Sequence, residues 1–157
     1  MDAPEEVILD VNALAEGESF MSAVILGVSP DGNLLAYAVD NTGFRQYTLY
    51  INDLRTGRIG PEAIARVTSM VWAEDNRSLL YTIEHEQTKR SYRVYRHVIG
   101  QANDPLVYEE SDERFSTHVY KSRDRQMIFI SASSYTTSEV RYLHAGQPAE
   151  EPRLIAA

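Results

Sequence analysis

The chain contains no cysteine among its 157 residues. Disulfide bonds, thiolate metal sites and a cysteine nucleophile are therefore excluded. No apolar run approaches the roughly 20 residues that a membrane-spanning helix needs. Residues 1–6 also lack the basic stretch and apolar core of a signal peptide. We therefore expect a soluble, cytoplasmic protein without a membrane partner.

Positive charge is scarce, because 15 lysines and arginines stand against 23 aspartates and glutamates, for a formal net charge of −8. A domain with this balance repels phosphate, so we expect no nucleic-acid partner. A basic ligand would be attracted. The plainer role of the charge is to keep the protein soluble.

The composition favours a folded domain built from strands. Hydrophobic residues make up 43% of the chain and charged residues 24%, which is typical of globular proteins rather than disordered ones. The ten tyrosines, together with frequent Val, Ile and Thr, suit half-buried pleated surfaces better than helices.

A repeated segment determines the fold that we predict. Three similar stretches, at residues 28–37, 72–81 and 121–130, each place a polar turn before an apolar strand. Their turn aspartates, Asp31, Asp75 and Asp124, lie 44 and 49 residues apart. Periods of about 40–50 residues with several strands each are typical of β-propellers.

The sequence therefore predicts an all-β fold of three consecutive four-stranded antiparallel blades, near 23–66, 67–112 and 113–157, after a lead-in at 1–22. Twelve strands are expected, near 23–28, 34–39, 46–54, 58–64, 68–73, 78–84, 92–99, 105–109, 115–121, 126–132, 138–144 and 152–156. Asp10 is expected to cap a short helix that ends by Gly17. A two-layer sandwich is the alternative, although it does not require similar units in tandem. Because three blades cannot close a ring, we expect a piece of a longer chain whose open blade faces self-associate.

The residues that could carry catalysis do not form a recognisable site. Ser29 nearly matches the G-x-S-x-G pattern, but a strand rather than a helix follows it, which favours a hairpin turn. The four histidines show no metal-ligand spacing; we expect His85 in a solvated loop and His97, His118 and His144 on strands. No glycine-rich phosphate loop or calcium loop is present. We therefore expect no catalytic residue, metal or cofactor in this chain.

Two connections carry more functional groups than packing requires. Residues 42–47 place Arg45, Gln46 and Tyr47 beside each other, and residues 135–141 contain Glu139 and Arg141. Both segments link the second and third strands of their units, so we expect them on one rim of the propeller. There an arginine can pair with a carboxylate on a partner domain. The alternative is that these side chains only cap turns and bridge blades.

The same segments resemble a known family. Residues 5–17, 28–32, 42–49, 107–115 and 136–142, in this order, are similar to the N-terminal propeller of the oligopeptidase B (protease II) branch of the prolyl oligopeptidase family. The Ser-Pro-Asp-Gly turn at 29–32 is common to many propellers. The segments around Arg45 and Glu139 are more specific.

The resemblance implies a seven-bladed propeller joined to a C-terminal α/β-hydrolase domain with a Ser-Asp-His triad, in an enzyme that cleaves short peptides after Arg or Lys. The propeller would restrict access to small, unstructured peptides, and Arg45 would be a candidate for a salt bridge to the hydrolase domain. None of the segments that resemble the family contains a residue of this triad. The alternatives are a non-enzymatic propeller that binds proteins and a peptidase of the same family with another specificity.

Overall fold

A computed structural model describes residues 5–156 of the chain, which form strands almost throughout. The elements are α1 (Val11–Leu14), β1 (Ser22–Val28), β2 (Leu34–Asp40), β3 (Thr48–Asp53), β4 (Arg58–Ile64), β5 (Val67–Trp72), β6 (Ser78–Glu84), β7 (Ser91–Val98), β8 (Leu106–Glu109), β9 (Ser116–Lys121), β10 (Met127–Ser133), β11 (Ser138–His144) and β12 (Arg153–Ala156). All twelve expected strands are present, each within two residues of its predicted bounds.

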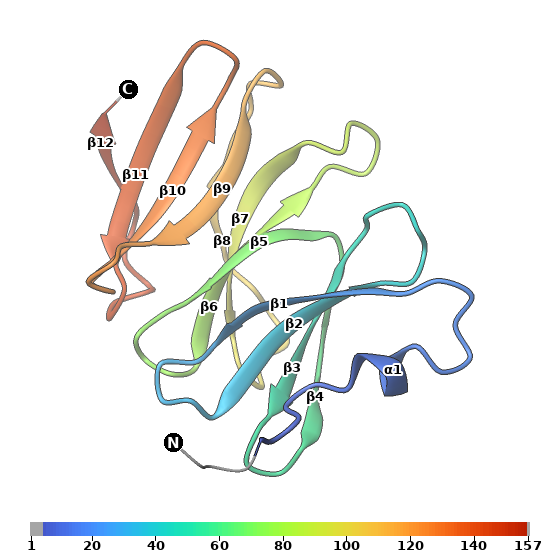
Figure 1. The fold of residues 1–157 in the computed structure, drawn as a ribbon. Coiled ribbons are helices and arrows are strands. Elements are labelled where there is room, and N and C mark those ends of the chain that lie inside the picture. Colours follow the sequence, from blue (N-terminus) through green and yellow to red (C-terminus); the bar gives the residue numbers. More distant parts are fainter. Residues whose placement is uncertain (1–4, 157) are drawn as a thin grey trace.

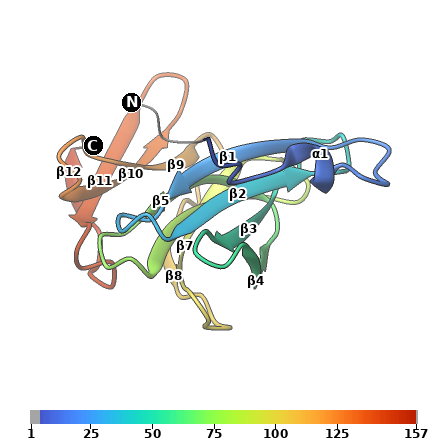
Figure 2. The same ribbon diagram turned by 60° about the horizontal axis from the view of Figure 1, so that its bottom comes forward.

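The strands form three antiparallel sheets of four strands, β1–β4, β5–β8 and β9–β12, each in sequence order. We call them the first, second and third sheets. They follow one another in space as they do in the chain, with the second sheet between the other two (Figure 1). A second view shows the same order (Figure 2). The predicted all-β fold of three successive four-stranded blades is confirmed, and the three sheets do not close into a ring.

Short polar turns join the first two strands of each sheet. Between β1 and β2, the Ser29 hydroxyl donates to Asp31 Oδ1 at 2.6 Å and accepts the Leu34 N–H at 2.9 Å. Gly32 has a φ of +78°, a left-handed conformation that glycine adopts without strain. The Ser29 hydroxyl therefore forms part of a hairpin turn, as predicted.

The lead-in forms the short helix that the sequence predicts. Asp10 Oδ1 accepts the N–H groups of Asn12 and Ala13 at 3.0 and 3.1 Å, which is the capping arrangement expected of an aspartate before a helix. Farther back, the Ile8 carbonyl accepts a hydrogen bond of 3.4 Å from the Asn52 side chain in β3. The lead-in is thereby placed against the first sheet.

Apolar side chains fill both interfaces between sheets, because the middle strands are apolar on both faces. We call the contact between the first and second sheets the first interface, and that between the second and third sheets the second interface. Along β6, Leu79 and Tyr81 pack in the first interface while Leu80, which lies between them in the sequence, packs in the second. All three are at most 5% exposed. Because successive side chains of a strand point to opposite faces of the sheet, one strand contributes to two cores.

Polar contacts also cross both interfaces. The Trp72 indole N–H donates to the Gly27 carbonyl at 3.1 Å, joining the second sheet to the first. The buried Ser69 hydroxyl accepts the Val119 N–H of the third sheet at 3.1 Å and contacts the Thr82 hydroxyl at 2.6 Å. These contacts satisfy polar groups that would otherwise be buried without partners.

A buried carboxylate links the edge of the first sheet to the second. Glu62 of β4 is 8% exposed, and its Oε1 accepts the Gly100 N–H at 3.0 Å. A Cβ atom placed at Gly60 would collide with the Glu62 carboxylate. Glycine at position 60 therefore leaves room for this contact between sheets.

We expect Gly60→Ala to lower the free energy of unfolding by about 1–3 kcal/mol, because the added methyl group must push the Glu62 carboxylate away from Gly100. Urea unfolding of the purified protein measures the change. Gly146→Ala is the matched control, since nothing lies within 4 Å of its added Cβ. Equal effects of the two substitutions would contradict this account.

We expect Ser69→Ala to destabilise the protein by about 1–3 kcal/mol, because the buried Val119 N–H loses its acceptor. Ser116→Ala, at an exposed position at the start of β9, serves as the control and should stay within about 0.5 kcal/mol of the unchanged protein. Amide hydrogen exchange at Val119 gives a local readout. Unchanged protection in Ser69→Ala would show that the hydroxyl does not hold the interface.

Candidate functional site

The connections of the sheets gather at two rims. A sheet of four antiparallel strands begins and ends on the same side, so the links 65–66 and 110–115 between sheets lie on the side of the hairpins 41–47, 85–90 and 134–137. We call these residues the linker rim, which runs from the top to the right of Figure 1. The turns between first and second strands lie at the opposite end, the turn rim. Loops on a rigid scaffold commonly carry function, so the linker rim is the candidate site.

A buried carboxylate fixes the hairpin that carries Arg45. Asp40, 2% exposed, accepts the Arg45 N–H at 2.8 Å and both the hydroxyl and the N–H of Thr42, at 2.6 and 2.9 Å. Burial acts to raise the pKa of Asp40, but these hydrogen bonds outweigh it and hold that pKa below its ordinary value. Asp40 therefore remains a charged acceptor that orders the hairpin at neutral pH.

The tip of this hairpin presents an aromatic ring and a cation to solvent. Phe44 is 77% exposed. Arg45 has a φ of +59°, which is uncommon for a residue with a side chain, and Asp40 holds it there. Within residues 5–156, the exposed Arg45 side chain makes no hydrogen bond or ion pair. A guanidinium on a fixed backbone is thus left free to bind.

Gln46 and Tyr47 are less exposed than Arg45. The Tyr47 hydroxyl lies 3.2 Å from the Ser22 hydroxyl, and the Tyr47 carbonyl accepts the Val67 N–H at 3.0 Å, across to the second sheet. The third strand was expected to begin at position 46, and it begins at Thr48, because the Tyr47 carbonyl bonds to β5 instead of β2. Tyr47 therefore lies where the first two sheets meet.

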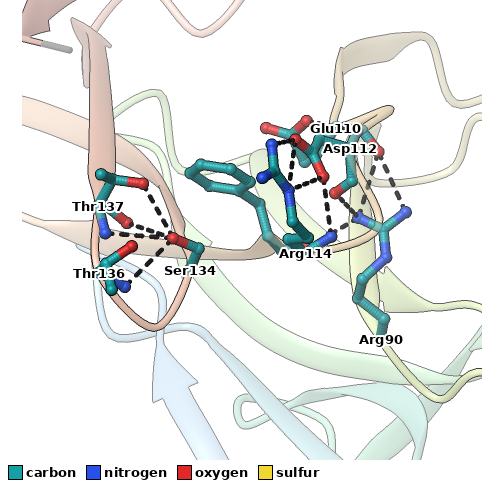
Figure 3. Close-up of polar contacts among 8 residues, drawn as sticks. Arg90, Glu110, Asp112, Arg114, Ser134, Thr136 and Thr137 are labelled. Atoms are coloured by element: carbon teal, nitrogen blue, oxygen red, sulfur yellow. Dashed lines mark hydrogen bonds and ion pairs between the residues drawn. The ribbon is translucent and has the colours of Figure 1, made fainter.

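The hairpin at 134–137 is held by its own serine. The Ser134 hydroxyl accepts the N–H of Thr137 at 3.1 Å and lies 2.9 Å from the Thr137 hydroxyl (Figure 3). Tyr135, at the tip, is fully exposed. This loop repeats the pattern of the first hairpin, a fixed backbone that presents an aromatic side chain.

Glu139 and Arg141 lie inside β11 rather than in the loop before it. They form an ion pair with each other, and the Arg141 guanidinium lies 4.7 Å from the centre of the Tyr108 ring in the second sheet. No hydrogen bond or ion pair within the described part of the chain joins either residue to Arg45, and the second sheet stands between them (Figure 1). The structure thus brings Glu139 and Arg141 together but leaves Arg45 apart.

Arg90 clamps the link between the second and third sheets. Its guanidinium donates to the carbonyls of Glu110, Asp112 and Phe115, the last at 2.7 Å (Figure 3). Within the link, the side-chain hydrogen bond from Arg114 lowers the pKa of Asp112 to about 2. The arginine at 90 thereby fixes a loop on which Arg114, paired with Asp112, is largely exposed. Sequence reasoning did not single out Arg90, since carbonyl acceptors leave no motif.

A buried polar cluster in the first interface was also missed. His97 is 4% exposed, its Nδ1 lies 2.8 Å from Asp104 Oδ1, and its Nε2 lies 3.8 Å from Glu62 Oε1. The Tyr81 hydroxyl donates to Asp104 Oδ2 at 2.7 Å, and burial together with this bond raises the pKa of Tyr81. His97 was expected on a strand with ordinary packing. It lies on β7 as expected, but it joins two carboxylates from other segments.

The described residues contain neither a cluster that could hold a metal ion nor a helix that could span a membrane. No three His, Asp or Glu side chains there gather closely enough to hold a metal ion. No helix in that part of the chain is long and apolar enough to cross a membrane. The candidate functional groups described above are the exposed arginines and aromatic rings of the linker rim and the polar groups at the interfaces.

Comparison with known proteins places these features in context. The chain is 41% identical over 149 residues to dipeptidyl aminopeptidase BI of Pseudoxanthomonas mexicana, covering 93% of this chain and 21% of that protein. It is 34% identical over 159 residues to protease 2 of Moraxella lacunata, covering 98% of this chain and 23% of that protein. The chain therefore spans about a fifth of the length of these relatives.

The fold also matches a solved structure. Oligopeptidase B from Leishmania major superposes with a TM-score of 0.89 at 30% sequence identity, over 96% of this chain and 22% of that one. The description of the matching family, over residues 1–157, reads "Prolyl oligopeptidase, N-terminal beta-propeller domain". With three blade-like sheets, relatives above 30% identity and this match over its whole length, the chain belongs to the family of N-terminal β-propeller domains of prolyl oligopeptidases.

Proposed function

We propose that this chain is part of the substrate-gating propeller of a serine-type oligopeptidase that resembles oligopeptidase B and cleaves short peptides after Arg or Lys. The observation that carries the proposal is the family relationship, since the relatives include protease 2 and oligopeptidase B. The catalytic Ser, Asp and His belong to an α/β-hydrolase domain elsewhere in the parent chain. The role of this chain is steric and electrostatic rather than chemical.

The linker rim is the surface that we assign to the hydrolase domain. Each sheet begins and ends on this rim, so a domain joined to the ends of the propeller is tethered on the same side. Phe44, Tyr135, Arg45 and Arg114 are exposed there on loops that side-chain hydrogen bonds hold in place. Aromatic residues and arginines on fixed loops are typical of binding surfaces.

The open face of the third sheet is where we expect the next blade of the parent. Tyr120 and Phe129 stack there with ring centres 5.2 Å apart, and Tyr120 is 40% exposed. Seven blades in all would close the ring that three sheets leave open. In the isolated chain, the same aromatic face would promote self-association.

The gate works by excluding folded substrates. A ring of rigid blades above a catalytic centre admits a flexible peptide but blocks a folded domain, which restricts hydrolysis without any contact to the scissile bond. The net charge of −8 supports attraction of basic peptides toward the ring. Access and charge together favour short peptides that contain Arg or Lys.

A propeller that binds proteins without any enzyme is the second candidate. The features in its favour are the same exposed Phe44 and Tyr135, which suit a protein partner equally well. The coding sequence beyond Ala157 separates the two. Further blades followed by G-x-S-x-G between a strand and a helix support the peptidase, and blades alone support the binding module.

We expect the full-length parent to hydrolyse a short unstructured peptide with one Arg–X bond at least about 100-fold faster, in kcat/KM, than the same sequence within a folded domain. A peptide with citrulline in place of Arg is the control for charge at the cleaved residue. A serine-reactive probe should abolish activity. Equal rates for the free and folded substrates would contradict gating, and equal rates for Arg and citrulline would contradict the specificity.

We expect Arg45→Ala in the full-length parent to lower kcat/KM for the short peptide about fivefold, the equivalent of about 1 kcal/mol for a partly exposed ion pair to the hydrolase domain. The loss should shrink at high salt, because salt screens such a pair. Arg123→Ala, at an exposed position on the turn rim, is the matched control. Identical kinetics for both variants would remove Arg45 from the domain contact.

A further inference from the structure

The second interface carries an arginine where the first interface carries a buried aliphatic residue. Arg96 lies opposite Leu80 in the register of β6 and β7, and Ile51 lies opposite Ala36 in the same place in the first sheet. Ile51 is only 2% exposed in its core. Replacement of such a residue by arginine introduces a charge that needs either a partner or water.

A second arginine faces the same interface from the third sheet. Arg141 lies opposite Ile130 in β10 and β11, the place that Tyr95 occupies opposite Tyr81 in the second sheet. Tyr81 and Tyr95 stack with ring centres 5.7 Å apart, whereas Arg141 instead covers the face of Tyr108. The two guanidinium groups therefore approach the second interface from opposite sheets.

Only one of these two cations has a partner within residues 5–156. Arg141 pairs with Glu139. The Arg96 side chain makes no hydrogen bond or ion pair there, and its Nε atom is buried without an acceptor. The residue as a whole is only partly buried, and a carboxylate is the group that matches the planar fork of a guanidinium.

A groove of about 360 Å³ opens beside both arginines. The ring of Tyr108 and the prolines Pro105, Pro148 and Pro152 form much of its walls. Such walls suit the apolar parts of a peptide, and the guanidinium groups suit its acid. The groove is therefore a built site with both an apolar and a charged component.

We propose that this groove between the second and third sheets binds a carboxylate-bearing peptide segment, with the acid held by Arg96 and Arg141. Glu150 and Glu151 also line the groove and oppose any anion, so inorganic phosphate, which offers no apolar group to the tyrosine and proline walls, fits less well. A free carboxylate ion lacks the apolar groups that the proline and tyrosine walls would cover. The ligand is therefore an acidic side chain or a chain end of a polypeptide.

The test compares two blocked tripeptides, acetyl-Ala-Glu-Ala-amide and acetyl-Ala-Gln-Ala-amide, by NMR titration of the purified protein. The Arg96 Nε–H signal reports on the guanidinium group that would hold the acid. We expect the glutamate peptide to shift this signal with an affinity at least about tenfold higher than that of the glutamine peptide. Acetate and inorganic phosphate serve as further probes and should bind more weakly than the glutamate peptide.

Three variants complete the test. Arg96→Gln should abolish the preference for the glutamate peptide, and Arg96→Lys should retain part of it, because lysine keeps the charge but not the planar fork. Both variants lack the Arg96 Nε–H group, so the backbone amide signals of Tyr108 and Arg141 report binding in them and in the unchanged protein. Arg77→Gln removes an exposed arginine of the turn rim and should bind like the unchanged protein. Far-UV circular dichroism confirms that each variant folds. The proposal is overturned if the two peptides bind equally, if phosphate binds best, or if Arg77→Gln loses as much as Arg96→Gln.

Discussion

The packing of apolar side chains between successive sheets is the constraint on which the rest of this structure depends. A single four-stranded sheet exposes two faces. Of the three sheets here, only the second has both faces covered by neighbouring sheets. Neighbouring residues along one strand are buried in different cores, as Leu79, Leu80 and Tyr81 of β6 show. The packing at these two interfaces fixes the strands and therefore the positions of the loops at both rims. The fixed hairpins at 41–47 and 134–137 present their aromatic tips in a defined direction only because the strands beneath them cannot slide.

Much of this architecture could be predicted because its signals are local. The turn at Ser29 depends on hydrogen bonds within six residues, and Pro30 and Gly32 indicate the turn in the sequence. The helix that begins after Asp10 is equally local. The order of the strands follows from the repeat of such turns, so the twelve strands could be located from the sequence. The start of the third strand was misplaced by two residues because Tyr47 bonds to the next sheet, which no local pattern indicates.

The polar side chains at the interfaces could not be predicted in the same way. His97 contacts Asp104 seven residues later and Glu62 from the preceding sheet, so its surroundings exist only after the sheets have packed. Arg90 binds three carbonyl groups, which every residue type offers. Arg96 is the exception that a closer comparison of the repeats would have found, because Ile51 occupies its place in the first unit. Of the candidates chosen from the sequence, Arg45 and Arg141 face different neighbours, because Arg45 lies in a hairpin loop on the rim whereas Arg141 lies within β11 and faces an interface.

The even number of strands in each sheet has a consequence for how such a protein can change over time. Because every sheet starts and finishes on the linker rim, adding or deleting one whole sheet leaves the two ends of the propeller on the same side. A host domain tethered to those ends would need no new connection when the number of blades changes. Loss of a single strand would instead move one tether to the far side of the ring. Duplication by whole units is therefore the change in length that this architecture tolerates.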